Sequence, residues 1–436
     1  MFKKLSEQFN RLQTGNLMRG AFQVIALRIA GVAFLFGITL FLTNFYSASQ
    51  VGTYEFVRSA LFLIGGFTML GTDQAILFFS GRFSKPDQVG ALFKVYFKML
   101  LLLFVVSLLF LVIILSVPSS TYQAVFNDAR SGSLLVKVGC CLFFYAVTLF
   151  NTEFFRAFNQ HAKSELYRGI IKQLPFGIGV LFLFVLKQPQ YLVEVFLGGF
   201  LFCAVVSSLE VFLNYKRFTV PKFKMPAIKL RTVLRATLPI AMSALGFYLL
   251  ISIDVFFLKR YTNFETLAYY GTSIKIIFLI STVINVIGSF LAVRIADLYV
   301  TNHQELHRLL KTGVRVIVVF STLLSVLLFV FSAEILSIFG AEYQQATLAL
   351  RILILGHYMA TLCGTTQVYL NMTKKQVVLQ YILILAVIIN CLLNWKLIPV
   401  YGIEGAATAS AISVLFWNFA AVVWVYKKDR IKLFLH

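Results

Sequence analysis

The feature that most constrains this chain is a succession of apolar runs, each long enough to cross a lipid bilayer as a helix. The hydrocarbon core is about 30 Å thick, and about 20 apolar residues in helical conformation cross it. The runs lie near residues 22–45, 55–79, 91–116, 133–155, 166–187, 191–214, 233–258, 266–292, 313–339, 346–371, 377–398 and 403–426. We therefore predict an all-α integral membrane protein with twelve transmembrane helices.

The composition agrees with lipid as the solvent of this chain. Hydrophobic residues make up 59% of the sequence and charged residues only 13%, whereas soluble domains are about 45–50% apolar and about 25% charged. The apolar runs are continuous and do not alternate with polar residues, as strands of a membrane barrel would. The first run is expected to target the chain to the membrane, because the basic segment before it has no signal-peptide cleavage pattern.

The net charge of +22 suggests nucleic acid until its distribution is considered. Of the 39 Lys and Arg residues, 29 fall in segments on one side of the predicted membrane and five on the other. Cytoplasmic loops of membrane proteins carry such an excess of positive charge. This bias predicts that both termini are cytoplasmic, and it excludes nucleic acid as a partner.

A basic, proline-bearing stretch at 215–232 divides the predicted spans into two sets of six. We predict an N-terminal six-helix bundle over 1–214, a basic cytoplasmic linker over 215–232 and a C-terminal six-helix bundle over 233–436. Transporters built from two such halves bind their substrates near the bilayer midplane, between the repeats. The sequence therefore predicts a cavity between the two bundles.

Several kinds of chemistry have no support in the sequence. The five cysteines lie in apolar runs without metal-ligand spacing, so neither a metal site nor a disulfide framework is expected. No glycine is followed by lysine, so the phosphate-binding loop of ATPases is absent. The loops are too short to hold a catalytic domain. We predict a transporter without catalytic residues, metal or cofactor, driven by an ion gradient, the membrane potential or the substrate gradient.

Charged residues inside the predicted spans are the candidate site, because ionisable groups within a membrane are costly and usually functional. Arg58 and Lys275 lie in the outer parts of the second and eighth spans, where each follows an aromatic hairpin. Arg28 lies in the first span, where it either faces the cavity or extends to the inner interface. We expect these three cations to bind an anionic substrate in the cavity.

Asp254 is the acidic residue most deeply surrounded by apolar neighbours, and it is the candidate for ion coupling. Two roles are open: a proton site, or a partner for a cation such as Lys275. Glu153 and Glu210 lie near the inner ends of their spans, and there we expect solvation at the interface.

Several segments, in order and spacing, resemble the polysaccharide-export branch of the multidrug/oligosaccharidyl-lipid/polysaccharide exporter superfamily, specifically O-antigen flippases of Wzx type. They are Gln50-Val51-Gly52-Thr53-Tyr54, Ile253-Asp254-Val255-Phe256-Phe257-Leu258, Ala268-Tyr269-Tyr270, Ile338-Phe339-Gly340-Ala341-Glu342-Tyr343 and 397–407. The resemblance implies a MATE-like fold with alternating access. It also implies flipping of an undecaprenyl-pyrophosphate-linked oligosaccharide to the outer leaflet of the bacterial inner membrane. Membrane lipids, a polysaccharide polymerase and a chain-length protein are the implied partners.

Two related functions remain as alternatives. Lipid II flippases are similar in an Arg-x-x-Gly motif, matched by Arg28-Ile29-Ala30-Gly31, and in cavity cations near Arg58 and Lys275. Cation-coupled multidrug exporters of the superfamily carry an acidic residue in the first span, and none occurs here between Phe22 and Phe45. Charge placement favours an anionic lipid-linked substrate, since a diphosphate needs cations to enter a membrane protein.

Overall fold

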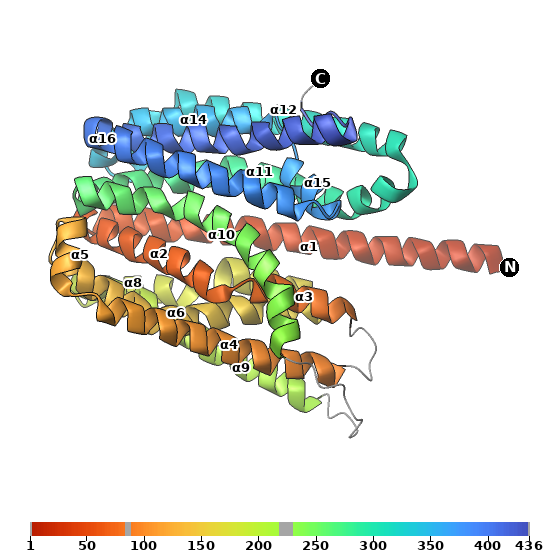
Figure 1. Ribbon diagram of the computed structural model, residues 1–436, viewed down its shortest axis with the longest axis horizontal. Helices are drawn as coiled ribbons and strands as arrows, with labels where there is room; N and C mark the ends of the chain where they lie inside the picture. Colours follow the sequence, from red (N-terminus) through yellow and green to blue (C-terminus); the bar gives the residue numbers. More distant parts are fainter. Residues whose placement is uncertain (1, 83–88, 218–229, 435–436) are drawn as a thin grey trace. The chain divides into compact units, whose positions relative to one another are not determined.

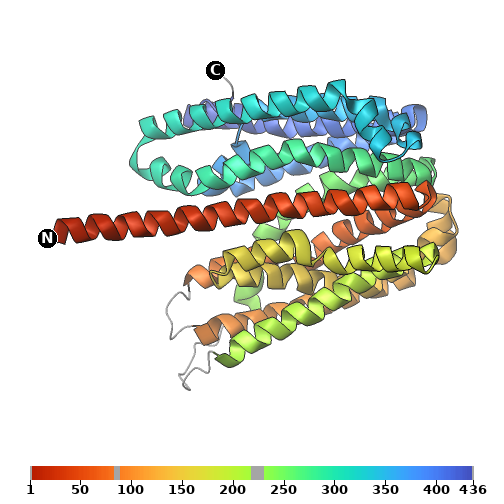
Figure 2. The ribbon, with the colours of Figure 1, turned by 180° about the vertical axis from the view of Figure 1, so that it is seen from behind.

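The computed structural model describes residues 2–82, 89–217 and 230–434, and these ranges are helical almost throughout (Figures 1 and 2). No strand occurs in the described ranges. Residues 218–229 of the predicted linker 215–232 lie outside them. The division of the sequence into six-span halves remains a prediction.

The chain forms two compact units, each assembled from separate stretches of sequence. The first unit consists of Met1–Ile38, Thr68–Val112 and Gly139–Ile240, and the second of Thr39–Phe67, Ile113–Val138 and Ala241–His436. The second unit thus includes two stretches from the first half of the sequence, one of which carries Arg58. It also contains Lys275 and Asp254.

The first unit contains most of the long helices that precede residue 218. They are α1 (Phe2–Phe45, to residue 38), α3 (Thr72–Arg82), α4 (Val89–Ser116, to residue 112), α6 (Arg130–Ala157, from residue 139), α7 (His161–Leu166), a π-helical turn (Tyr167–Ile171), α8 (Leu174–Val185) and α9 (Leu192–Arg217). Its core is aromatic: Tyr96 of α4 stacks on Phe150 of α6 with ring centroids 5.2 Å apart. The apolar face of α4 that carries Leu101, Leu108 and Leu109 is exposed, as expected for a surface that contacts lipid.

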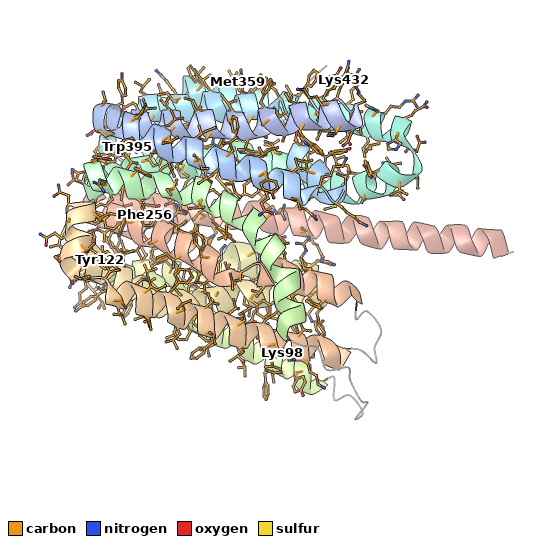
Figure 3. The ribbon with its side chains drawn as sticks, in the orientation of Figure 1. Lys98, Tyr122, Phe256, Met359, Trp395 and Lys432 are labelled. Atoms are coloured by element: carbon orange, nitrogen blue, oxygen red, sulfur yellow. The ribbon has the colours of Figure 1, made fainter. Side chains whose placement is uncertain are left out.

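The second unit contains the remaining helices. They are α2 (Ala48–Met69, to residue 67), α5 (Ser119–Phe126), α10 (Leu230–Tyr261, from residue 241), α11 (Phe264–Thr301), α12 (His303–Val330), α13 (Ser332–Ile338), a 3-10 turn (Ala341–Ala346), α14 (Thr347–Thr361), α15 (Thr366–Met372) and α16 (Gln376–Asp429). Met359 of α14 and Trp395 of α16 project from exposed faces of their helices (Figure 3).

The number of spans follows from where the helices break. Eight described helices are long and apolar enough to cross a membrane, or nine with the bent pair Ala341–Thr361 and Thr366–Met372. Helix α16 is two helices joined at Gly402, whose φ of 54° and ψ of −125° are not helical. Helices α2 and α10, with 22 and 32 residues, are long enough as well. Adding these two and the second half of α16 to the nine gives the predicted twelve.

Candidate functional site

A buried group of three charged side chains joins α2 to α11 within the second unit. The Glu55 carboxylate lies between two cations: its Oε1 is 2.5 Å from Nζ of Lys275, and its Oε2 is 2.9 Å from Nη2 of Arg58. The side chains of Glu55 and Lys275 are 1% and 4% exposed, while that of Arg58 is 16% exposed. The group carries one positive charge in excess, and Arg58 forms its most accessible edge.

Helical spacing and two glycines account for this arrangement. Glu55 and Arg58 are three residues apart on α2, so they share one face, and Arg58 Nε also donates to Glu55 Oε2 at 2.9 Å. A Cβ atom on Gly52 would lie 1.6 Å from the Phe264 carbonyl oxygen, and one on Gly271 would lie 2.9 Å from the Glu55 carboxyl carbon. Only glycine permits α2 and α11 to approach this closely.

Aromatic rings complete the surroundings of the two cations. The Lys275 ammonium lies 5.4 Å from the centroid of the Tyr54 ring, and the Arg58 guanidinium 5.3 Å from that of Phe62. Such contacts stabilise partly desolvated cations. Both side chains thus have a carboxylate and an aromatic ring as partners in an apolar environment.

Asp254 occupies a second buried polar group of the same unit, on α10. Its carboxylate accepts hydrogen bonds from the Tyr270 hydroxyl at 2.7 Å, the Asn394 amide at 2.7 Å and the Ser410 hydroxyl at 2.5 Å. Asn390 in turn accepts from Asn394 at 3.0 Å. These residues belong to α10, α11 and both halves of α16, so Asp254 connects α10 to α11 and to the two parts of α16 on either side of Gly402.

The alternatives for Asp254 are narrowed by these contacts. Its three hydrogen-bond donors are neutral, and Lys275 pairs with Glu55 instead. Of the two roles left open for Asp254, pairing with Lys275 is therefore not the one that the structure has. Asn394 Oδ1 is buried and has no hydrogen-bond partner among the described residues. Among the described residues, no ion pair neutralises the Asp254 carboxylate, and the amide that donates to it has an oxygen without a hydrogen-bond partner.

Arg28 lies in the first unit, where it pairs with an acid of α7. Its Nη2 is 2.9 Å from Oε1 of Glu165, and the Arg28 side chain is 26% exposed. One turn further along α1, a Cβ atom on Gly31 would lie 2.6 Å from the Cα of Gly169 in the π-helical turn. The Arg-x-x-Gly motif thus supplies an ion pair and a close helix contact within this unit.

The acids Glu153 and Glu210 are also engaged in ion pairs of the first unit, which corrects the expectation of simple solvation. Glu153 is 6% exposed and pairs with Arg168 and with Arg156. Glu210 pairs with Lys163.

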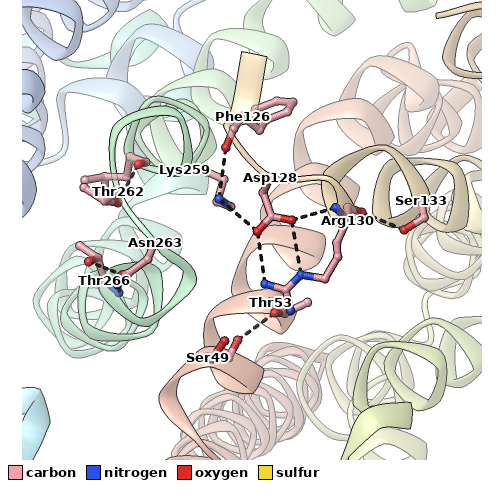
Figure 4. A network of polar contacts seen from close by, with 11 residues as sticks. Ser49, Thr53, Phe126, Asp128, Arg130, Ser133, Lys259, Thr262, Asn263 and Thr266 are labelled. Atoms are coloured by element: carbon pink, nitrogen blue, oxygen red, sulfur yellow. Dashed lines mark hydrogen bonds and ion pairs between the residues drawn. The ribbon is translucent and has the colours of Figure 1, made fainter. Parts of the chain in front are cut away.

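A second ionic cluster of the second unit connects the turn between α5 and α6 to the end of α10 (Figure 4). Asp128 accepts hydrogen bonds from the backbone and side chain of Arg130, and its Oδ2 lies 3.7 Å from Nζ of Lys259. Lys259 also donates to the Phe126 carbonyl at 3.2 Å. The cluster lines a polar pocket of about 380 Å³ beside the start of α11.

The environment of Asp128 favours its ionised form. Burial alone raises the pKa of a carboxyl group, but hydrogen bonds from Arg130 and the charges of Arg130 and Lys259 outweigh burial here. The pKa of Asp128 is therefore lower than usual.

The sequence predicted the cations but not their counterions. Glu55 and Glu165 were not among the candidate residues, although Glu55 lies one helical turn before Arg58. That spacing was the available signal. Among the described residues, no group of three or more His, Cys, Asp or Glu side chains has the arrangement of a metal site.

Comparison with known proteins agrees with this architecture. The sequence profile of the family described as polysaccharide biosynthesis protein matches residues 17–293, which is more than half of the chain, and that of the MatE family matches residues 239–396. Comparison with curated proteins finds no match.

Solved structures share the fold at low sequence identity. A structure described as lipid II flippase MurJ in an inward closed conformation has a TM-score of 0.72 and 13% identity, over 94% of this chain and 87% of that one. An inward-facing multidrug resistance MATE family transporter has a TM-score of 0.69 and 13% identity, over 94% and 98%. A structure described as a MOP superfamily transporter from Pyrococcus furiosus has a TM-score of 0.58 and 12% identity, over 94% of this chain and 95% of that one.

These findings define a multi-pass, all-α membrane protein of the transporter and flippase class, and they confirm the predicted MATE-like fold. The chain belongs to the polysaccharide biosynthesis protein family, within the superfamily that the sequence resembles.

Proposed function

We propose that this protein flips an undecaprenyl-pyrophosphate-linked oligosaccharide from the cytoplasmic to the outer leaflet for surface polysaccharide assembly. Membership of the polysaccharide biosynthesis protein family supports the substrate class. The observation that carries the proposal is the convergence of Arg58 and Lys275 on one carboxylate in the apolar interior of the second unit. The mechanism is alternating access.

The chemistry of such a substrate explains the cations. A diphosphate and its glycan cannot cross hydrocarbon unaided, while the polyprenyl tail can remain in lipid. Arg58 offers a planar fork of donors that suits two phosphate oxygens, and Lys275 offers a compact charge. Arg28 of α1 is the third proposed contact, and it would exchange Glu165 for phosphate. Each charge-assisted contact contributes about 1.5–3 kcal/mol.

Asp254 is the proposed ion-coupling residue. Its buried carboxylate has only neutral donors, and Asn394 Oδ1 beside it has no hydrogen-bond partner among the described residues. A proton or a small cation would neutralise the carboxylate, and uncompensated buried charge is costly. Loading and release of that ion would therefore bias the packing of α10, α11 and α16.

The proposed setting is the bacterial inner membrane, with both termini in the cytoplasm. The positive-inside bias of the sequence supports this orientation. Membrane lipids surround the protein, and a polysaccharide polymerase and a chain-length protein are the proposed partners that receive the flipped substrate.

A cation-coupled multidrug exporter is the second candidate function. The MatE family match over 239–396 supports it, because those residues include Asp254 and its partners Tyr270 and Asn394. A drug exporter would confer resistance to cationic dyes and would not depend on Arg58 or Lys275. A lipid II flippase would instead restore growth of cells that lack their own.

The proposal is tested by surface polysaccharide in a flippase-null strain that expresses single variants. Alanine at Arg28, Arg58 or Lys275 should abolish or sharply reduce the polymer at an unchanged level of membrane-inserted protein, whereas Arg58→Lys should retain part of it. Lys94→Ala, at an exposed lysine on α4, is the matched control and should restore the polymer. Normal polymer from all three alanine variants would refute the cationic site.

A further inference from the structure

Glu55 lies between the two cations that we propose as contacts of the anionic substrate. Its two carboxylate oxygens divide between the two cations, Oε1 to Lys275 and Oε2 to Arg58, so neither cation is available while Glu55 remains. Gly271 leaves room for this carboxylate on α11, since a Cβ atom there would lie 2.9 Å from its Cδ and Oε2. The site is therefore built around an internal anion.

Charge balance indicates what happens when a diphosphate arrives. A diphosphate that links a polyprenol to a sugar carries one negative charge on each phosphate. With Glu55 in place, the three side chains have one positive charge in excess, and the loaded site would be negative. Without Glu55, the two cations match the two phosphates. In an apolar interior the neutral combination is strongly favoured.

We propose that Glu55 is an exchangeable counterion: the diphosphate displaces it from Arg58 and Lys275, and this exchange breaks the ionic link between α2 and α11. The inference rests on the proposed function and deepens it. The 16% exposed Arg58 side chain is the edge at which the incoming anion first competes. A released carboxylate has to reach water, because a buried unpaired charge is costly. Displacement of Glu55 and loss of the ionic link between α2 and α11 are thus one event, so the conformational change is tied to the bound substrate.

The test is equilibrium binding of undecaprenyl diphosphate to the purified full-length protein in nanodiscs. Glu55→Gln removes the competing charge and keeps the shape of the side chain. It should bind at least about tenfold more tightly than the wild type, which corresponds to about 1.4 kcal/mol, and with a steeper dependence on salt. Glu55→Asp should bind like the wild type. Glu342→Gln, an exposed carboxyl outside the cluster, is the matched control and should leave the affinity unchanged.

Inorganic pyrophosphate separates recognition of the anion from recognition of the lipid. Exchange of counterions predicts that Glu55→Gln also tightens binding of inorganic pyrophosphate. Tightening confined to the lipid probe would overturn the proposal. A merely structural role for Glu55 predicts lower thermal stability with unchanged or weaker binding of both probes, and that result would overturn it as well.

Gly271→Ala gives an independent answer, including the case in which Glu55→Gln does not fold. The added methyl group occupies the space of the Glu55 carboxyl group and moves it away from the cations, so binding should again tighten. Wild-type affinity in Gly271→Ala would contradict the exchange. If the wild type binds and Lys275→Ala weakens binding while Glu55→Gln leaves it unchanged, only this inference fails. If the wild type binds neither probe, the proposed function fails with it.

Discussion

Gly31 of α1 and Gly169 of the π-helical turn lie in backbone contact, such that a Cβ atom on Gly31 would be 2.6 Å from the Gly169 Cα. The Gly169 backbone cannot give way as a flexible side chain can. The contact also positions α1 along α7, and so places Arg28, one turn earlier on α1, within reach of Glu165. This pair of glycines therefore sets the packing on which the Arg28 ion pair depends.

We predict that Gly31→Ala destabilises the protein although alanine favours helix. Overpacking of this kind costs about 1–3 kcal/mol, which exceeds the gain in helix propensity of up to about 1 kcal/mol. The thermal midpoint in detergent should fall. Gly37→Ala on the same helix is the control, because a Cβ atom at Gly37 meets nothing within 4 Å, and its midpoint should hold or rise. Equal effects of the two substitutions would contradict the proposed contact.

The cluster around Asp128 predicts a dependence of stability on acid pH. Since hydrogen bonds and cations hold the pKa of Asp128 below its unfolded value, its carboxylate stabilises the fold at neutral pH. That contribution declines as the pH falls from about 3.9, the usual pKa of Asp, through the folded pKa. Asp128→Asn should lower the thermal midpoint at pH 7 and weaken its acid dependence.

The control for Asp128→Asn is Glu265→Gln, which changes an exposed carboxyl group in the wall of the same pocket. It should change the midpoint little at either pH. An unchanged acid profile in Asp128→Asn would show that other carboxyl groups govern acid unfolding.

The sequence predicted the spans well because a membrane imposes length and apolarity on each of them. The predicted boundary between two spans at 398–403 coincides with the break at Gly402 in α16. The break inside a span was not predicted: the run 55–79 is divided between α2 and α3 at Leu70 and Gly71, both with positive φ. Hydropathy averages over about 19 residues and does not detect a single backbone reversal.

The sequence was sufficient to predict the cations of the site, but not the carboxylates with which they pair. A lysine or arginine inside an apolar run is visible in the sequence, as Arg58 and Lys275 were. Whether it binds a substrate or a carboxylate depends on contacts between distant segments, such as Glu55 with Lys275 or Arg28 with Glu165. Glu55 and Asp254 are both acids within apolar surroundings, and only the packing of α2 on α11 assigns Lys275 to Glu55.

The positive-inside bias predicts the side on which each connection lies. Reporter fusions at Lys163 and His303 should report the cytoplasm, and fusions at Asp128 and Gln344 the outside. These positions lie at or between helix ends: Lys163 in the short α7, His303 at the start of α12 and Asp128 between α5 and α6. Two or more reversed reporters would contradict the twelve-span topology.

Substitution of Asp254 separates ion coupling from substrate binding. Asp254→Asn keeps a similar shape and removes the charge. The side chain can still form hydrogen bonds with Tyr270 and Ser410, and no buried carboxylate remains to be neutralised by an ion. In proteoliposomes, an imposed proton or sodium gradient should accelerate flipping of a lipid-linked oligosaccharide by the wild type. The variant should lose that acceleration and retain affinity for undecaprenyl diphosphate, because Arg58 and Lys275 are untouched.

Asp297→Asn, an exposed acid on α11, is the control and should respond to the gradient like the wild type. Comparison of the two gradients identifies the ion: a response to protons alone indicates titration of the Asp254 carboxyl group. A response to sodium indicates coordination by the Asp254 carboxylate and by Asn394 Oδ1, which has no hydrogen-bond partner among the described residues, since small hard cations favour carboxylate and carbonyl oxygens. If Asp254→Asn still responds to the gradient, the coupling residue is not Asp254.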